Sequence, residues 1–176
     1  EGTFSSNDVS IFVSYAKKNI LTEVIDNLSG GVNLKFIKSK IDTSQAYAVA
    51  FDVGFLYNHL DRMRLSLVFS NIGTKMKFED EADGLPLSIK VGGCYLFNDR
   101  FRLAGEIEEF LNEAKFYPSL GFEFSLKDGF VLRTGYRFGY DTSNLGTETG
   151  LSLGFGINTK DVSFNYANVF FGELGN

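Results

Sequence analysis

The segment YAVAFDVGFLY, from Tyr47 to Tyr57, decides the fold class of this chain. Every second residue is aromatic or β-branched, and the residues between them are Ala, Ala, Asp, Gly and Leu. A period of two indicates a β-strand with one apolar and one more polar face. Strands of soluble domains usually have five or six residues, whereas a tilted strand that crosses a membrane needs roughly nine to eleven. The length of this run therefore predicts a membrane-spanning strand.

The same alternation recurs along the chain and gives about ten strands. The other runs cover residues 9–15, 32–36, 63–69, 87–97, 101–107, 120–126, 130–140, 151–157 and 162–166. They predict an all-β fold, a transmembrane antiparallel up-and-down β-barrel, with residues 1–176 forming a single domain. A soluble β-sandwich has the same alternation with a dry inside and a charged outside, so it remains the alternative fold.

The lengths of the connections support the barrel. Tight turns at 98–100, 127–129 and 159–161 alternate with longer loops at 73–84, 109–115 and 141–148, as in bacterial barrels with short periplasmic turns and long outer loops. The connection at 17–29 is long on the short side, and its apolar residues have helical spacing, so a short amphipathic helix and an ordinary loop both fit. Because a bacterial barrel has an even strand number with both ends in the periplasm, we expect the domain to be incomplete at both ends.

The composition argues against several classes of function. The 176 residues carry a net charge of -5, one Cys and one His, so a thiolate zinc site, a metal centre or a Ser/His/Asp relay has few residues to draw on. We therefore expect no enzyme activity, no metal and no cofactor. The acidic balance also predicts that the chain does not bind nucleic acid, which requires clustered Lys and Arg.

The best candidates for function are charged residues at the strand positions that alternate with the apolar ones. These positions are called the polar parity of a strand, and the others its apolar parity. A charge that faces lipid at the midplane costs roughly 2 to 4 kcal/mol, so these side chains should face the lumen. They could form a polar passage or ligand site, or a salt-bridged network that fills a narrow lumen, and their mixed signs favour the filled lumen over ion selectivity. These residues are Arg64, Lys90, Arg102, Glu106, Glu108, Glu123, Arg133 and Arg137.

Two other sets of residues have structural or functional readings. Phe78, Phe170 and Phe171 are apolar residues on predicted outer loops, where they could contact a secreted partner or a hydrophobic ligand, or pack across the barrel mouth. Five glycines are predicted to face the lumen, where small residues relieve the crowding of side chains. They are Gly135, Gly139, Gly150, Gly154 and Gly156.

Several longer segments resemble the PorV/PorQ family of outer-membrane proteins. SNIGTKMKFEDEADGLPLSIKVGGCY (Ser70 to Tyr95) is similar to a characteristic hairpin of that family, and three further segments resemble its consecutive strands. Those segments are GVNLKFIKSKID (Gly30 to Asp42), AVAFDVGFLY (Ala48 to Tyr57) and LRTGYRFG (Leu132 to Gly139). YANVFFGELGN, from Tyr166 to the end, resembles the last outer loop, although members often have Pro where this chain has Phe170. The turn at 20–26 is also longer than the family pattern.

The resemblance implies a FadL-like barrel of roughly fourteen strands in the bacterial outer membrane. Three strands before Glu1 and one after Asn176 would complete that number. It also implies outer-membrane lipid as a partner and a role in protein secretion, in which a type IX-like shuttle binds secretion-machinery proteins or exported cargo. The alternatives are a FadL-like transporter of hydrophobic small molecules and a purely structural barrel. The family has no catalytic motif to transfer.

Overall fold

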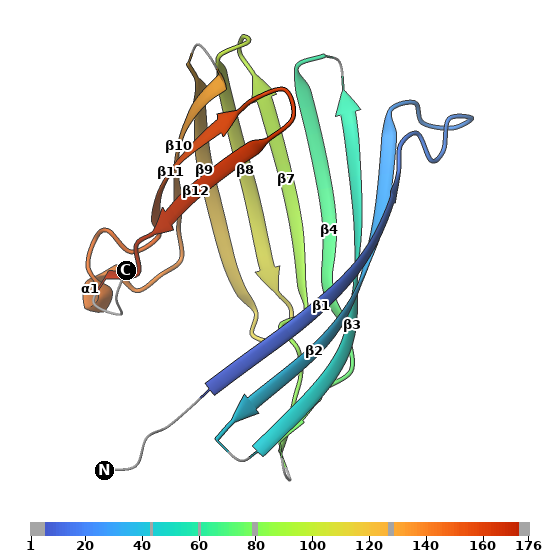
Figure 1. Ribbon diagram of the computed structural model, residues 1–176, viewed down its shortest axis with the longest axis vertical. Helices are drawn as coiled ribbons and strands as arrows, with labels where there is room; N and C mark the ends of the chain where they lie inside the picture. The colour runs from blue at the N-terminus through green and yellow to red at the C-terminus, as the bar shows by residue number, and fades with distance from the viewer. Residues whose placement is uncertain (1–5, 43, 60, 79–80, 127–128, 173–176) are drawn as a thin grey trace. The chain divides into compact units, whose positions relative to one another are not determined.

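The computed structural model describes residues 6–42, 44–59, 61–78, 81–126 and 129–172. Ten long strands form one antiparallel sheet in the order β1-β2-β3-β4-β7-β8-β9-β10-β11-β12, so each long strand pairs with the next long strand along the chain (Figure 1). The strands of this sheet are β1 (Ser6–Lys17), β2 (Leu28–Ile41), β3 (Ser44–His59), β4 (Met63–Gly73), β7 (Ser88–Leu96), β8 (Phe101–Phe110), β9 (Lys115–Ser125), β10 (Phe130–Arg137), β11 (Leu151–Asn158) and β12 (Ser163–Val169). The predicted all-β antiparallel architecture is confirmed at this level.

The chain groups into two compact units. The first unit comprises Glu1–Tyr57, Ser66–Lys90 and Glu109–Lys115. The second comprises Asn58–Leu65, Val91–Glu108 and Phe116–Asn176. Five strands of the sheet, β3, β4, β7, β8 and β9, contribute residues to both units.

In the first unit, β2 is paired along its length with both β1 and β3. The β1–β2 register runs from Ser6 opposite Ile41 to Lys17 opposite Gly30. The β2–β3 register runs from Leu28 opposite Tyr57 to Ile41 opposite Ser44. Asp42 begins the tight turn between these two strands and has a positive φ of 53°, a backbone conformation that hairpin turns require and that Asp tolerates.

From Gln45 to Phe51, burial along β3 follows the predicted alternation, with the large apolar side chains on the exposed face. Ala46, Ala48 and Ala50 are at most 4% exposed, whereas Tyr47 is 62% exposed and Phe51 44%. A strand of a soluble sheet has the opposite arrangement, because its large apolar residues lie in the core. On this strand the small residues are buried and the large apolar ones meet the surroundings.

The second unit repeats this arrangement on β9, β10 and β11. Leu120, Phe122 and Leu132 are about half exposed, whereas Val131 and Gly156, on the other parity, are buried. The registers place Arg133 opposite Glu123 of β9 and opposite Gly154 of β11. The polar parity that the sequence predicts is therefore a real face of the sheet in this unit.

The connections differ from the sequence prediction in three places, and at 18–27 the structure decides between its two alternatives in favour of a loop. The loop predicted at 73–84 contains a small hairpin, β5 (Met76–Phe78) and β6 (Glu81–Asp83), and the loop at 141–148 contains a single helical turn, α1 (Thr142–Leu145). The loop predicted at 109–115 is shorter, because β8 continues to Phe110 and β9 begins at Lys115. No helix forms at 18–27, where the backbone makes turns.

Three further points complete the connections. The tight turns at 98–100 and 159–161 are present, whereas residues 127 and 128 of the third predicted turn lie outside the described residues. Within the described part of the chain, no helix is long and apolar enough to cross a membrane. Gly139 and Gly150 lie outside the strands, and a Cβ at either one would be crowded, at 2.9 Å from the Tyr117 ring and 2.2 Å from the Arg137 carbonyl oxygen. Their φ values of 99° and 94° are a second reason for glycine, which the sequence did not predict.

Candidate functional site

The polar face of the second unit is organised around Glu123 on β9. Its Oε1 lies 2.8 Å from Arg102 Nη1 on β8, and its Oε2 accepts a hydrogen bond of 2.7 Å from Arg133 Nε on β10. The Glu123 side chain is 17% exposed, whereas the two arginines are about 40% exposed. One carboxylate thus joins cations from the two strands that flank it.

Arg133 also reaches in the other direction, across β11. Its Nη1 donates a hydrogen bond of 2.7 Å to Asn165 Oδ1 on β12. Gly154 and Gly156 occupy the β11 positions that the arginine crosses. A Cβ at Gly156 would lie 2.7 Å from Asn165 Oδ1 and 3.0 Å from Arg133 Nη1. The absence of a side chain at this position therefore creates the space for the hydrogen bond.

A second ion pair lies on the same face. Arg137 Nη2 donates to Glu108 Oε2 at 2.8 Å, and Glu108 is buried, with 5% of its side chain exposed. The sheet order places β9 between these two residues, and Arg137 lies opposite a small residue there, Ser119. The guanidinium carbon of Arg137 is 4.6 Å from the centre of the Tyr117 ring, which is cation–π distance.

Tyr140 completes this end of the face. Its ring centre is 5.7 Å from that of Tyr117. Periodicity predicts that Tyr140 belongs to the apolar face, but β10 ends at Arg137 and Gly139 redirects the chain with its positive φ. Tyr140 therefore joins the aromatic support of Arg137.

This arrangement holds fixed charges. Removing a carboxylate from this network would leave half-buried arginines without a partner. The loss in free energy of unfolding would be larger than if both charges were replaced, because an unpaired cation keeps its desolvation penalty. The Nε atoms of Arg102 and Arg137 are buried and have no hydrogen-bond partner among the described residues. Nowhere in the described ranges of the chain is a group of His, Cys, Asp and Glu arranged to hold a metal ion.

A second polar network, which the list of sequence candidates misses, lies in the first unit. Lys35 Nζ is 2.7 Å from Asp52 Oδ1 and donates to Asn71 Oδ1 at 2.6 Å. Asp52 also accepts hydrogen bonds from the Asn33 side chain, at 3.0 Å, and from the Asn71 backbone amide, at 2.9 Å. Ser14 extends the network to β1 through a 2.8 Å hydrogen bond to Asn33. Four of the five have the polar parity of their strands, and that parity is the signal that could have identified them. Asn71 has the apolar parity of β4, and its positive φ of 62° interrupts the alternation there.

The structure does not join every predicted charge to these networks. Arg64 and Glu106 are exposed, and among the described residues neither takes part in an ion pair. Lys90 is half-buried and belongs to the first unit. Five residues of the predicted set form ion pairs with one another in the second unit, and Arg64 and Glu106 do not join them. The five are Arg102, Glu108, Glu123, Arg133 and Arg137.

The three phenylalanines belong to different units. Phe78 ends β5 in the first unit and is half-buried. In the second unit, the Phe170 amide donates to the Leu151 carbonyl at 2.9 Å and its carbonyl accepts from the Gly150 amide, so Phe170 continues the β11–β12 pairing. Phe171 is 43% exposed and is the phenylalanine of the set most available for contact.

Comparison with known proteins adds no assignment to these observations. The chain matches no protein-family model and no curated protein sequence.

Proposed function

We propose that this chain forms part of the wall of a β-barrel in the bacterial outer membrane, with its apolar face in contact with lipid. The observation that carries the proposal is the inverted burial of the strands. Tyr47, Phe51 and Phe122 are 44 to 62% exposed, whereas the alanines of β3 and Glu108 are buried. Large apolar residues are stable on an exposed face when that face meets hydrocarbon rather than water.

The length of the apolar face on β3 supports the same proposal. The aromatic and β-branched residues of its apolar parity run from Tyr47 to Tyr57, which are ten residues apart, and Tyr side chains are typical of membrane interfaces. At ~3.3 Å per residue this distance is roughly 33 Å along the strand, or about 25 Å along the membrane normal at a tilt of about 40°. The apolar band of outer-membrane barrels has about this height.

The polar face would then line the lumen. In the second unit its arginines pair with Glu108 and Glu123 and stack on Tyr117, so their charge is largely compensated. A face of this kind favours a lumen filled by side chains over a wide, ion-selective channel.

For the biological role, we propose support of protein secretion at the outer membrane, as a non-enzymatic barrel that binds secretion-machinery proteins or exported cargo. The support for this role is the resemblance of five segments to the PorV/PorQ family. A transporter of hydrophobic small molecules is the competing role, because the same resemblance extends to FadL-like barrels. Both roles have outer-membrane lipid as the surrounding partner.

A pair of valine substitutions tests the membrane location. Val32 is 51% exposed near the middle of the apolar face of β2, and Val24 is 79% exposed in the β1–β2 connection. In lipid vesicles, Val32→Lys should lower the free energy of unfolding by about 2 to 4 kcal/mol, whereas Val24→Lys should change it by less than ~0.5 kcal/mol. Equal stability of the two variants, in a protein that folds without detergent or lipid, would overturn the proposal.

Affinity purification of the full-length protein from outer membranes in mild detergent tests the role. Mass spectrometry of the proteins and lipids that co-purify should identify a secretion translocon or exported proteins. A stoichiometric fatty acid or other apolar molecule, with no protein partner, would support the transporter instead.

A further inference from the structure

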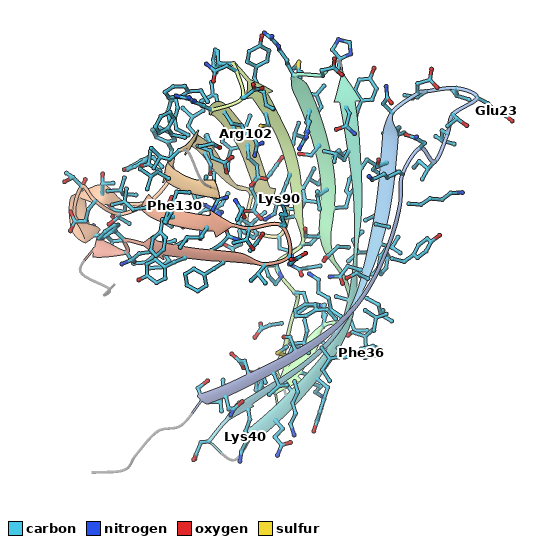
Figure 2. The ribbon with its side chains drawn as sticks, turned by 45° about the horizontal axis from the view of Figure 1, so that its top comes forward. Glu23, Phe36, Lys40, Lys90, Arg102 and Phe130 are labelled. Carbon is cyan, nitrogen blue, oxygen red and sulfur yellow. The ribbon has the colours of Figure 1, made fainter. Side chains whose placement is uncertain are left out.

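The apolar face of the first unit changes to a cationic one at the end of β2. The outward residues Val32, Leu34 and Phe36 are 40 to 51% exposed, and Lys38 and Lys40 follow on the same parity. Figure 2 labels Phe36 and Lys40 along this strand and Glu23 in the connection beyond its opposite end. The two lysines therefore lie where the apolar band ends.

The register shows that Lys38 marks the limit of this band. Lys38 is opposite Tyr47, and Leu28 is opposite Tyr57. The Lys38 ammonium lies 5.5 Å from the centre of the Tyr47 ring. An aromatic ring and a long cationic side chain at the limit of an apolar band are typical of the layer in which lipid headgroups lie.

A pocket opens beside these lysines. It has a volume of about 440 Å³ and is lined by Ser6, Asn7, Val9, Lys38 and Lys40. Asn7 is directly opposite Lys40, and Val9 is directly opposite Lys38, so the pocket bridges β1 and β2. It combines two ammonium groups, an amide and an apolar wall.

Among the residues that the structure describes, no carboxylate pairs with the positive charge of this pocket. Asp8 on β1 has the opposite parity and accepts a hydrogen bond from Ser39, on the other face of the sheet. Asp42, in the adjacent turn, is exposed, and neither lysine forms an ion pair within the part of the chain that the structure describes. The contrast with Lys35 is direct, because Lys35 on the other face of β2 is paired with Asp52.

We infer that the pocket between β1 and β2 binds the phosphate group of an anionic lipid. Lys38 and Lys40 supply the charge, Asn7 supplies a hydrogen-bond donor, and the apolar residues below them contact the acyl chains. This inference rests on the proposed membrane location of the apolar face. A free phosphate ion has the same headgroup chemistry, and only the contact with the acyl chains distinguishes the lipid from it.

Native mass spectrometry of the full-length protein in a nonionic detergent tests this site. The probe is dioleoyl phosphatidic acid, and dioleoylglycerol, which lacks the phosphate, is the reference. The double substitution Lys38→Gln and Lys40→Gln should weaken binding of phosphatidic acid about 30-fold, because each lysine contributes roughly fivefold to the affinity and the two factors multiply. Binding of dioleoylglycerol should not change. Arginine at both positions should restore binding.

A second lysine pair gives the matched control. Lys75 and Lys77 have the same spacing and are exposed, but Lys75 lies in the β4–β5 connection and Lys77 in β5. Their double substitution to Gln removes the same charge and should change the affinity less than twofold. Equal binding by wild-type protein and the Lys38/Lys40 variant, or an equal loss in the Lys75/Lys77 variant, would overturn the inference.

Inorganic phosphate distinguishes the two sources of the ligand. If inorganic phosphate displaces phosphatidic acid at equal molarity, the site binds the free anion, and the lipid inference is wrong. If phosphatidic acid stays bound, the ligand is the lipid. Failure of the membrane proposal is read separately, because it appears as a protein that folds in buffer and retains no lipid of either kind. In that case inorganic phosphate binding, compared between the two lysine variants, still tests the pocket.

Discussion

Gly156→Ala should break the link between β10 and β12 without removing any group that takes part in it. The new Cβ would lie 2.7 Å from Asn165 Oδ1, closer than side-chain carbons approach such atoms, and 3.0 Å from Arg133 Nη1, which is tighter than most such contacts. The Asn165 side chain must then move, and the 2.7 Å hydrogen bond from Arg133 is lost. This charge-assisted bond is worth about 1 to 2 kcal/mol once the partial exposure of both side chains is considered.

An opposing effect reduces the net change. Ala restricts the unfolded chain more than Gly does and stabilises a strand by about 0.4 to 1 kcal/mol where it fits. We therefore expect Gly156→Ala to lower the free energy of unfolding by about 1 kcal/mol. The measurement is denaturant unfolding of the protein in lipid vesicles, followed by far-ultraviolet circular dichroism.

A double-mutant cycle gives the decisive comparison. With Asn165→Ala in place the contact is gone, so Gly156→Ala should become neutral or stabilising, with a coupling energy of about 1 to 2 kcal/mol. Gly121→Ala is the matched control on β9, because its Cβ would meet only the Thr134 carbonyl oxygen, at 3.7 Å. A coupling energy near zero, or an equal loss in Gly121→Ala, would refute the reasoning.

Two further substitutions test the polar face and the turn that follows it. Glu123→Gln should lower the free energy of unfolding by about 1 to 3 kcal/mol in the same assay, because two arginines lose their carboxylate partner. Glu106→Gln, at an exposed position, should change it by less than ~0.5 kcal/mol. Equal effects of the two substitutions would contradict the role of Glu123. Gly150→Ala should cost at least ~2 kcal/mol, because its φ is 94° and the Cβ would lie 2.2 Å from the Arg137 carbonyl oxygen. Gly105→Ala should be near neutral, because its Cβ would make only ordinary contacts, with the Leu120 side chain at 3.5 Å and the Ser119 carbonyl oxygen at 3.8 Å. Full stability of the Gly150 variant in thermal unfolding would exclude this strain.

The strands and their two faces could be predicted because a single period determines both. In β3, alternation alone predicts which side chains share a face of the strand, and in the structure Ala48 and Ala50 are buried whereas Tyr47 and Phe51 are exposed. The same reasoning fails for Tyr140, because the period ends where the strand ends. Short elements such as α1 and the β5–β6 hairpin span too few residues for any period to be visible.

The partners of the charged residues could not be predicted, because they depend on register and on side-chain reach. Asp52 has the polar parity, but its contact with Lys35 follows from the alignment of β2 with β3, which sequence alone does not give. Arg137 reaches Glu108 across an intervening strand, and this requires a small residue, Ser119, at the position opposite it. Parity therefore identifies the face, and only the structure identifies the pairs.

The short connection between β2 and β3 has a consequence for the order of folding. These strands are aligned from Leu28 opposite Tyr57 to Ile41 opposite Ser44, and Asp42 already has the turn conformation. Closing so short a loop costs little chain entropy, whereas the β1–β2 connection at 18–27 must close a longer one. We expect the β2–β3 hairpin to form first and to serve as the template on which β1 and β4 assemble, so that folding rates are most sensitive to changes at this turn.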